Sequence, residues 1–409
     1  MRLFPMYLVI LLVFVNRYVF GLFLKTAKGG SFDSTRPDYE PTVTVVTPMF
    51  NEGKGISRTI RSVASFEYPK HKLDMVVVDD ASTDDSYEAA LETARSFPNV
   101  RVLRNPVNVG KRMSIIAAVR RSTSEIILSI DSDVQVAPDA LRKLVARFTH
   151  PEIAAVGGRV NVSNANQNWL TRMQAIKYYF GYEFLKNLER SLQTVMCLSG
   201  CLTAYRRSVL LEVEPILLKR GLLGVPIKYG EDRFLTRQIV KRGYRTLSTL
   251  DAVCSTLAPT TLSKYFSQQL RWRRSNLVDV LGGVTHVWAL HPIVCTHYLA
   301  LASMLVAYPL IVLEEISQGS FFDLAWFNLC VLSCMAALYW CRTRKLPIAE
   351  RVHPIWFLAA AVVMPVTYVL FTPLALFTLD SSSWETRGSP IAAVAPVNEE
   401  ALEAGPQAA

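Results

Sequence analysis

Long apolar blocks at both ends of the chain constrain its fold more than any other feature of the sequence. The blocks are Leu3–Leu24, Ile293–Leu313, Leu324–Cys341 and Ile355–Leu379. About 20 consecutive apolar residues in a helix cross a hydrocarbon layer of ~30 Å. The sequence therefore predicts a transmembrane anchor within residues 1–28, a transmembrane region over residues 291–380, and a globular domain, residues 29–290, between them. A cleaved signal peptide is the alternative for the first block, but no small-x-small cleavage site precedes Lys25.

The charges of the loops between the apolar blocks predict the orientation of the chain. The linker Arg342–Arg351 is basic, whereas Glu314–Asp323 carries acidic residues and no Lys or Arg. Because basic loops stay on the cytosolic side of a membrane, we expect a multi-pass protein of the cell membrane with a cytosolic globular domain. Pro365 and Pro373 leave two possibilities for the last block, a full crossing or a bent, re-entrant segment. The composition of Gly388–Ala409 predicts a disordered tail.

Basic residues outnumber acidic residues, with 44 Lys and Arg against 34 Asp and Glu. Several of the basic residues stand beside the apolar blocks, and no basic-aromatic module for nucleic acid is recognisable. We therefore expect phosphates and a lipid bilayer, and no nucleic acid, as the partners of these charges. The seven cysteines form no C-x-x-C pair, which predicts buried free thiols in a reducing compartment.

Short β-branched runs alternate with helical patterns in the first half of the globular domain. The predicted strands are Val43–Thr47, Met75–Val78, Val100–Leu103 and Ile126–Ile130. The predicted helices are Ser57–Ser65, Ser86–Phe97 and Lys111–Arg121. This alternation indicates an α/β fold with a parallel sheet, which binds ligands at the carboxyl ends of its strands. Pro48, Asn51 and Glu52 stand at the end of one predicted strand, where a nucleotide site is expected.

The second half of the globular domain has mainly helical patterns. Helices are predicted over Ala140–Phe148 and Trp169–Leu192. A further segment, Leu262–Leu281, has apolar residues at helical spacing with Lys264 and three arginines, Arg271, Arg273 and Arg274, between them. We expect it to be an amphipathic helix at the membrane surface, with an ordinary domain helix as the alternative.

The acidic pair Asp131 and Asp133 directly follows a predicted strand. Two carboxylates in a D-x-D turn can bind Mg²⁺ or Mn²⁺, which prefer oxygen ligands and bridge phosphates. Such a metal neutralises charge as a diphosphate leaves. A capping turn at the surface is the alternative reading of the same residues.

Further residues of nucleotide-binding character stand at the ends of other elements. Asp79 and Asp80 close an apolar strand, where they can contact a nucleoside or cap a helix. Lys111 follows Gly110 and can reach a phosphate as a point charge, although a solvated lysine has the same pattern.

The segment Gly230–Arg233 carries the candidate catalytic carboxylates. Attack by an acceptor hydroxyl requires one carboxylate to accept its proton, and Asp232 is the predicted general base. Glu231 is the alternative base, or a neighbour that tunes Asp232. An ion pair between Asp232 and Arg233 is the structural alternative.

Two aromatic and basic motifs predict binding of an acceptor and a diphosphate. In the first motif, Gln268, Arg271 and Trp272 supply an amide, a fixed cation and a flat ring. In the second motif, Trp384 and Arg387 supply a similar pair near the C-terminus, within residues 381–409.

Taken together, these motifs closely resemble those of processive family 2 glycosyltransferases, and the resemblance covers roughly Pro41 to Arg387. The motifs are Pro48–Glu52, Asn108–Arg112, Asp131–Asp133, Ser199–Cys201, Tyr205–Arg207, Gly230–Arg233, Gln268–Trp272 and Trp384–Arg387. The most similar branches are the rhizobial chitooligosaccharide synthases (N-acetylglucosaminyltransferases) and the bacterial hyaluronan synthases.

The resemblance implies a GT-A, Rossmann-like glycosyltransferase domain with transmembrane and interfacial helices. It implies an inverting enzyme that polymerises GlcNAc from UDP-GlcNAc, with UDP-GlcA as a possible second donor, Mg²⁺ or Mn²⁺ as cofactor, and a growing β-linked glycan as acceptor. In that family the aspartates matching Asp131 and Asp133 bind metal, and the one matching Asp232 is the base. The W-x-T-R loop, which holds Trp384 and Arg387, closes over the nucleotide, which favours a re-entrant last block.

Departures from the family pattern leave the product open. Phe50 replaces a tyrosine, Cys201 a proline and Glu385 a glycine of the usual motifs. The alternatives to a chitooligosaccharide or hyaluronan synthase are a non-processive enzyme with a lipid acceptor and a cellulose-like synthase that uses another UDP-sugar. A transporter with a degenerate nucleotide-binding domain is disfavoured by the intact acidic motifs.

Overall fold

The computed structural model describes residues 34–222, 224–346, 351–380 and 407–408. The chain divides into two compact units. The sheet unit contains 29–160, 189–256 and 380–409, and the helical unit contains 1–28, 161–188 and 257–379. The predicted anchor, residues 1–28, lies outside the described residues, as do Trp384 and Arg387.

The sheet unit contains a mixed sheet in the order β11-β3-β2-β1-β4-β7-β6-β10-β5. The strands are β1 (Val43–Met49), β2 (Leu73–Asp79), β3 (Val100–Arg104), β4 (Ile126–Ser129), β5 (Gln135–Val136), β6 (Ile153–Val162), β7 (Thr203–Arg206), β10 (Arg245–Thr256) and β11 (Gln407–Ala408). A separate small hairpin pairs β8 (Gly221–Leu222) with β9 (Val225–Pro226).

The central strands β3, β2, β1 and β4 run parallel, which confirms the predicted parallel sheet. In register, Val46 of β1 lies opposite Val76 of β2 and Ser129 of β4. The carboxyl ends of these three strands therefore meet at one edge of the sheet. The chain order reverses between β2 and β4 on either side of β1, and such a switch point is where open α/β sheets bind ligands.

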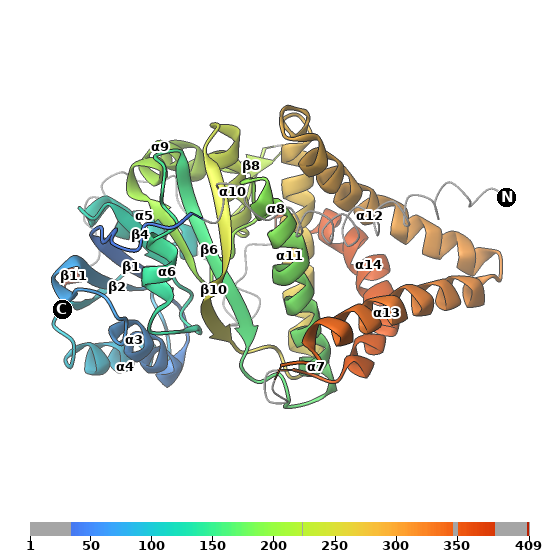
Figure 1. Ribbon diagram of the computed structural model, residues 1–409, viewed down its shortest axis with the longest axis horizontal. Helices are drawn as coiled ribbons and strands as arrows, with labels where there is room; N and C mark the ends of the chain where they lie inside the picture. Colours follow the sequence, from blue (N-terminus) through green and yellow to red (C-terminus); the bar gives the residue numbers. More distant parts are fainter. Residues whose placement is uncertain (1–33, 223, 347–350, 381–406, 409) are drawn as a thin grey trace. The chain divides into compact units, whose positions relative to one another are not determined.

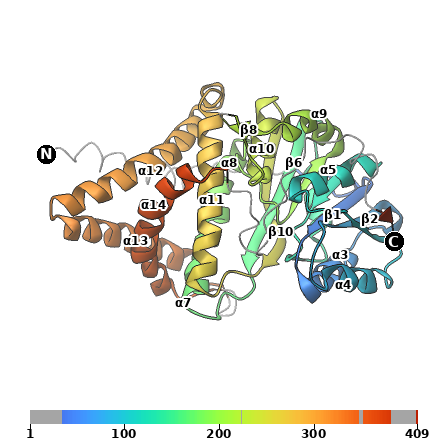
Figure 2. The same cartoon turned by 180° about the vertical axis from the view of Figure 1, so that it is seen from behind.

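Helices cover both faces of the sheet (Figures 1 and 2). They are α3 (Ile56–Ala64), α4 (Ser86–Ala94), α5 (Lys111–Arg121), α6 (Ala140–Val145), α9 (Arg207–Leu218) and α10 (Glu231–Lys241). The prediction of α5 is confirmed at both ends, that of α3 is confirmed with a shift of one residue, and those of α4 and α6 are confirmed with shorter bounds. Helix α5 begins at Lys111, directly after Gly110, which has a φ of +87° that suits glycine.

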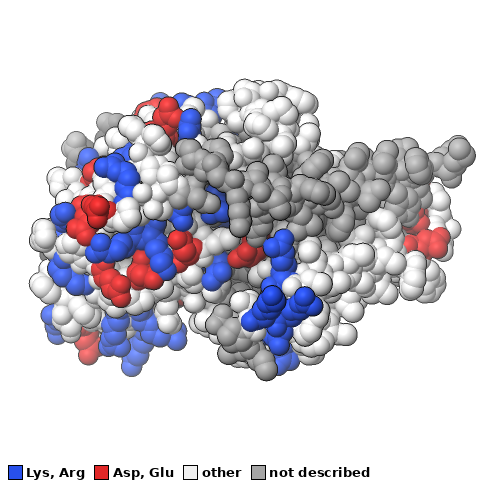
Figure 3. Space-filling view, in the orientation of Figure 1, with Lys and Arg blue, Asp and Glu red and all other residues white. Residues whose placement is uncertain are grey.

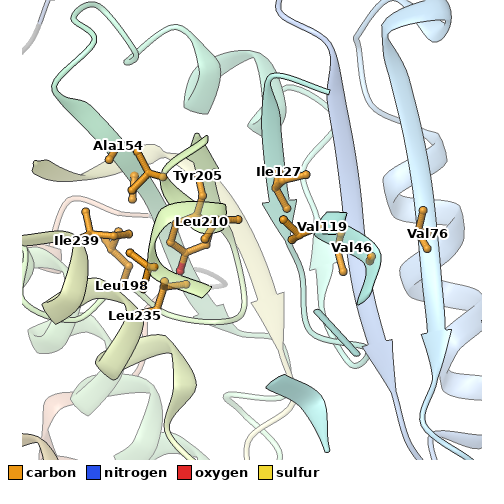
Figure 4. Packing of buried hydrophobic residues seen from close by; sticks show 14 of the residues in the cluster. Val46, Val76, Val119, Ile127, Ala154, Leu198, Tyr205, Leu210, Leu235 and Ile239 are labelled. Carbon is orange, nitrogen blue, oxygen red and sulfur yellow. The ribbon is translucent and has the colours of Figure 1, made fainter. Parts of the chain in front are cut away.

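A buried apolar cluster joins one face of the sheet to α5, α9 and α10 (Figure 4). Val46 and Ile127 come from adjacent parallel strands, and both are fully buried. Val119 of α5, Leu210 of α9 and Ile239 of α10 pack in the same cluster. This core fixes α5 and α10, which begin with the candidate site residues Lys111, Glu231 and Asp232.

The antiparallel part of the sheet was not predicted, because the second half of the globular domain was expected to be mainly helical. Strands β7 and β6 pair antiparallel beyond β4, and β10 pairs antiparallel with β5. Gly157 and Gly158 interrupt the β-branched pattern of β6, which hides it from a sequence reading. Within the segment that was predicted to be a disordered tail, Gln407–Ala408 form a short strand that pairs antiparallel with β3 at the edge of the sheet.

Replacing Gly158 by alanine should destabilise the sheet unit. A Cβ atom there would lie 2.5 Å from Leu202 Cδ2 and 2.7 Å from the Ala252 carbonyl oxygen. Such overpacking costs about 1–3 kcal/mol, so the midpoint of thermal unfolding of the purified chain should fall. Gly181→Ala is the control, because no atom lies within 4 Å of its added Cβ. An unchanged unfolding midpoint in Gly158→Ala would contradict this packing.

The helical unit is built mainly from helices. They are α7 (Trp169–Phe180), a π-helical segment (Gly181–Lys186), α11 (Leu262–Gly283), α12 (Pro292–Ser317), α13 (Phe321–Thr343), a 3₁₀ segment (Pro354–Ala359) and α14 (Ala360–Phe377). The short helix α8 (Asn187–Ser191) crosses from the residues of this unit into those of the sheet unit. Helix α14 contacts α11, α12 and α13. An aromatic cluster with Phe180, Tyr265, Tyr339 and Phe357 packs between α7, α11, α13 and the 3₁₀ segment.

Two helices in the described part of the chain have the length and apolar character needed to cross a membrane. They are Pro292–Ser317, with a mean hydropathy of 1.8, and Pro354–Phe377, with a mean hydropathy of 2.0. They coincide with two of the predicted apolar blocks. The predicted block Leu324–Cys341 forms the body of α13, and this helix is not one of the two that meet the length and hydropathy needed to cross a membrane.

The predicted helix Leu262–Leu281 is present as α11, but its predicted basic face is wrong in part. Arg273 and Arg274 are buried, with 7% and 5% exposure. The Arg273 guanidinium lies over the Tyr368 ring at 3.7 Å, and Arg274 Nε donates to Thr378 Oγ1 at 2.9 Å. An arginine can be buried in this way when a ring or a hydroxyl group compensates its lost hydration.

The prediction that the cysteines are buried is also wrong in part. Cys254 and Cys295 are buried, whereas Cys330, Cys334 and Cys341 are exposed on α13. Their helix is apolar, and no other described element covers the faces on which they stand. None of the seven cysteines, all of which lie within the described residues, forms a disulfide, as predicted.

Charged side chains of both signs are interspersed over the sheet unit on the face that Figure 3 shows.

Candidate active site

The loop after β1 is tied to the loops after β2 and β4. Asn51 has a φ of +50°, and its Oδ1 accepts a hydrogen bond from the backbone N–H of Thr83 at 2.9 Å. Glu52 Oε1 accepts from Ser132 Oγ at 2.7 Å, and Ser132 is the middle residue of the D-x-D turn. Pro48 is buried in β1 opposite Val78. The predicted residues of this loop therefore lie at the switch point of the sheet.

Asp79 ends β2 and is fully buried. Its Oδ2 lies 3.1 Å from Arg104 Nε, and both carboxylate oxygens accept from the backbone N–H of Ser82 at 3.3 Å. Burial raises the pKa of Asp79, against the lowering effect of the Ser82 hydrogen bonds and the Arg104 charge. The carboxylate thus closes the turn that follows the strand.

Asp80 holds the segment that leads into α5. Its Oδ1 accepts from Asn105 Nδ2 at 2.8 Å and from the backbone N–H of Val109 at 3.0 Å, and its Oδ2 accepts from the backbone N–H of Gly110 at 2.7 Å. Ser114 Oγ is 3.3 Å from Oδ1. Burial raises the pKa of Asp80, against these hydrogen bonds. The carboxylate thereby fixes the backbone on which Lys111 is mounted, a role that the sequence did not reveal.

Replacing Asp80 by asparagine should loosen this segment. An amide keeps one acceptor oxygen but turns an N–H₂ group toward donors, and losing hydrogen bonds to a charged group costs about 1.5–3 kcal/mol. Unfolding of the purified chain should therefore begin at a lower temperature. Asp74→Asn, at an exposed position of the strand that precedes Asp80, is the control and should leave this temperature unchanged. Equal effects of the two substitutions would contradict the proposed role of Asp80.

Lys111 lies between two carboxylates that are far apart in the sequence. Its Nζ is 2.6 Å from Asp131 Oδ1 and 2.8 Å from Glu231 Oε1. Burial disfavours the charged amine, but the charges of Asp131, Glu231 and Asp232 raise the pKa of Lys111 well above its usual range. The structure therefore brings together the predicted phosphate-binding lysine, the first D-x-D aspartate and both candidate catalytic carboxylates.

The carboxylates of Glu231 and Asp232 stand at the start of α10. Gly230 precedes them with a φ of +66°, in the left-handed region that glycine adopts without strain. Asp232 Oδ1 accepts from the backbone N–H of Arg233 at 2.8 Å. Burial opposes ionisation of Glu231, yet the charge and hydrogen bond of Lys111 hold its pKa well below the usual range. The positive end of the helix dipole also favours carboxylates at this position.

The D-x-D turn lies where β4 ends. Asp131 Oδ2 accepts a weak hydrogen bond from Cys201 Sγ at 3.6 Å, and Asp133 Oδ2 accepts from Thr256 Oγ1 at 3.4 Å. Burial and the charge of Asp131 raise the pKa of the Cys201 thiol well above its usual range, so that it remains a donor.

The chemistry of these two carboxylates fits a metal that binds together with phosphates. Among the described residues, no group of three or more His, Cys, Asp or Glu side chains could hold a metal ion. Mg²⁺ is commonly held by one or two carboxylates, with substrate phosphates and water completing its coordination. Asp131 and Asp133 would supply two carboxylates and leave the remaining coordination positions to phosphates and water.

Gly200 lies beside the candidate site, although the sequence indicated it only as part of a motif. A Cβ atom on Gly200 would lie 2.8 Å from Lys111 Nζ and 3.3 Å from Asp131 Oδ1. The absence of a side chain at Gly200 therefore leaves room for the contact between the lysine and the aspartate. Its place between Ser199 and Cys201 in a motif of the resembled family was the available signal.

The predicted acceptor residues Gln268, Arg271 and Trp272 all lie on α11 of the helical unit. The Trp272 side chain is 36% exposed, and its ring is 6.4 Å from that of Tyr178. Arg271 Nε is buried and has no hydrogen-bond partner in the part of the chain that the structure describes. An exposed ring and an unsatisfied guanidinium nitrogen suit a ligand that offers a sugar face and oxygens.

Comparison with known proteins identifies the family. The family model described as "Glycosyltransferase like family 2" matches residues 41–275. An N-acetylglucosaminyltransferase of Rhizobium meliloti (strain 1021) is 32% identical over 366 residues, which cover 87% of this chain and 83% of that protein. One of Rhizobium leguminosarum bv. viciae is 33% identical over 364 residues, with coverage of 87% and 83%.

A solved structure shows the same fold. A mannosyltransferase from Pyrobaculum calidifontis, in complex with GDP-Man and Mn²⁺, has a TM-score of 0.57 and 22% sequence identity, and the match covers 88% of this chain and 97% of that chain. The fold expected from the sequence, GT-A with additional apolar helices, is therefore confirmed. The chain belongs to glycosyltransferase family 2 and is a glycosyltransferase.

Proposed function

We propose that this protein polymerises GlcNAc from UDP-GlcNAc into a β-linked oligosaccharide, by inverting transfer to the end of a growing glycan. The observation that carries the proposal is the convergence of Lys111, Asp131 and Glu231, next to Asp232, at the carboxyl edge of the sheet. A cation and several carboxylates at such an edge suit a nucleotide diphosphate and an attacking hydroxyl. The similarity to N-acetylglucosaminyltransferases over most of the chain supports GlcNAc as the transferred sugar.

In this proposal Asp232 accepts the proton of the acceptor hydroxyl. It is partly exposed and forms a hydrogen bond to a backbone N–H, so one face of its carboxylate can meet the acceptor. Glu231 is held ionised by Lys111, which suits a residue that orients the lysine better than one that takes up a proton. We therefore assign the base to Asp232 and an orienting role to Glu231.

Asp131 and Asp133 would hold Mg²⁺ or Mn²⁺ on the donor side of the site. When bound, such a metal neutralises the charge that develops on the departing diphosphate. Lys111 adds a second positive charge toward that diphosphate. The loop of Pro48, Asn51 and Glu52, together with the turns closed by Asp79 and Asp80, would form the wall that receives the nucleoside.

On the acceptor side, we assign Trp272 to stacking on a sugar ring, and Gln268 and Arg271 to polar contacts with acceptor and UDP. Trp384 and Arg387, from the predicted loop over the nucleotide, complete the proposed set. We further propose that the protein is an integral protein of the cell membrane with its active site in the cytosol. The two long apolar helices, Pro292–Ser317 and Pro354–Phe377, support the membrane location.

The test is incorporation of radiolabelled UDP-GlcNAc by membranes that contain the protein, with Mg²⁺ or Mn²⁺, in the presence and absence of UDP-GlcA. We expect a product that forms without UDP-GlcA and is degraded by chitinase. A product that requires both donors and is degraded by hyaluronidase would replace the proposal with a hyaluronan-type synthase. Label found only in a lipid extract would indicate a non-processive enzyme with a lipid acceptor, and incorporation of none of these kinds would overturn GlcNAc as the sugar.

A further inference from the structure

Lys111 occupies the position in which a bound cation would neutralise the first D-x-D aspartate. Its Nζ bridges Asp131 after β4 and Glu231 on α10, at 2.6 and 2.8 Å. Without a cation there, these two carboxylates and Asp232 would repel one another in a largely buried place. The lysine therefore supplies the charge balance that the site needs when no donor is bound.

The contacts of Asp131 are of a kind that can be exchanged. Its Oδ1 is paired with the Lys111 ammonium at 2.6 Å, a group at the end of a flexible side chain. Its Oδ2 is met by the Cys201 thiol at 3.6 Å, and a thiol is a weak donor. Apart from the Lys111 ammonium, the carboxylate of Asp131 is therefore met by a weak donor.

Hydrogen bonds of the residues on either side of Lys111 hold the backbone in place, while the lysine side chain can still rotate. Gly110, the preceding residue, donates its backbone N–H to buried Asp80 at 2.7 Å. Arg112, the following residue, donates from Nη1 to the Ile227 carbonyl at 2.8 Å. Between these anchors the lysine ammonium is a compact charge on a flexible stem with three rotatable donors. A swing of the side chain requires no change in the backbone.

From these contacts we propose that Lys111 holds the place of the divalent metal at Asp131 and leaves it for the donor diphosphate when metal and nucleotide arrive together. The inference rests on the proposed function, because it assumes a metal-dependent nucleotide donor. The exchange conserves charge: Asp131 passes from an ammonium to a metal, and the ammonium passes from a carboxylate to a phosphate. A metal that arrives alone must displace the lysine without offering it a new anion, so metal and nucleotide should bind cooperatively.

The test is Mn²⁺ binding to the purified full-length chain, followed by electron paramagnetic resonance with and without UDP. In the wild type we expect weak Mn²⁺ binding that UDP strengthens at least about tenfold, the size of effect that one neighbouring charge has on a carboxylate. In Lys111→Gln, Mn²⁺ binding without UDP should become about tenfold tighter, and the strengthening by UDP should shrink. Unchanged or weaker Mn²⁺ binding in Lys111→Gln without UDP would overturn the proposal.

Two controls separate this effect from loss of a lysine or loss of the fold. Lys111→Arg keeps the charge and should keep the weak binding without UDP, whereas Lys143→Gln removes a lysine that pairs with Asp139 elsewhere and should change nothing. If Lys111→Gln alone is unstable, the double variant Lys111→Gln with Glu231→Gln removes one charge of each sign and should still bind Mn²⁺ more tightly than the wild type. Tighter binding is not expected from a lysine with a purely structural role.

The readout is independent of sugar transfer. If the wild type incorporates no GlcNAc but Lys111→Gln binds Mn²⁺ more tightly than the wild type in the absence of UDP, the proposed function fails and the role of Lys111 stands. If GlcNAc is incorporated but Lys111→Gln does not bind Mn²⁺ more tightly, the role of Lys111 fails and the proposed function stands.

Discussion

Replacing Asp232 by asparagine should lower the rate of GlcNAc transfer about 10²–10⁴-fold, the range that a general base contributes. The amide has nearly the same shape as the carboxylate and can still accept the hydrogen bond from the Arg233 N–H, but it cannot take up the proton of the acceptor hydroxyl. UDP affinity should be unchanged, because Lys111 and Asp131 remain in place. Transfer is measured by incorporation of labelled GlcNAc, and UDP affinity by titration calorimetry.

The control for this experiment is Asp38→Asn, an exposed aspartate of the sheet unit, which should transfer GlcNAc at the wild-type rate. Glu231→Gln separates the two candidate bases. It should reduce affinity for the donor through the loss of one anchor of Lys111, while transfer at saturating UDP-GlcNAc should fall less than in Asp232→Asn. Retention of the wild-type rate in Asp232→Asn would exclude this residue as the base.

Replacing Asp131 by asparagine should weaken UDP binding in the presence of Mn²⁺ by about 10²-fold, since even supporting residues around a metal site change metal affinity 10–100-fold. An amide is a poorer ligand than a carboxylate, and the substitution also frees Lys111 from one of its two anions. UDP affinity should be measured with Mn²⁺ and again with a chelator. The wild type should lose affinity on chelation, whereas Asp131→Asn should be nearly insensitive to it.

Asp139→Asn is the matched control, because Asp139 is 43% exposed and pairs only with Lys143 among the ion pairs of the described residues. It should keep the metal dependence of the wild type. A metal-dependent UDP affinity that is equal in Asp131→Asn and the wild type would remove Asp131 from the metal site. Thermal unfolding of both variants shows whether each remains folded at the temperature of the measurement.

The parallel half of the sheet was predictable because its strands are buried on both faces. The runs at β1, β2 and β4 are almost continuously apolar and β-branched, and a helix with clear boundaries follows most of them. The antiparallel half was missed because its strands are not continuously apolar and β-branched. Strands β6 and β10 contain glycine, serine, threonine and charged residues, and their pairing with β7 and β5 joins segments that are distant in the chain.

The candidate site likewise has features that the sequence predicted and features that only the structure shows. Asp79, Asp80 and Asp131 were placed correctly at strand ends, because the carboxyl ends of parallel strands share one edge. The sequence assigned Asp131 to a metal and Asp79 and Asp80 to a nucleoside or a helix cap, but it could not show which groups each carboxylate contacts. In the structure Asp80 is surrounded by four donors from residues 105–114, whereas Asp131 faces Lys111 and Cys201.

The sequence by itself determined the family and the fold class and indicated the candidate site residues, because each of those depends on local patterns and on short motifs. Tertiary structure alone decided which charges meet. Lys111 finds its partners in Asp131 and Glu231 because the core joins β4, α5 and α10 and because Gly200 leaves room between them. Electrostatic energy depends on distance and burial, and neither quantity can be read from the order of residues along a chain.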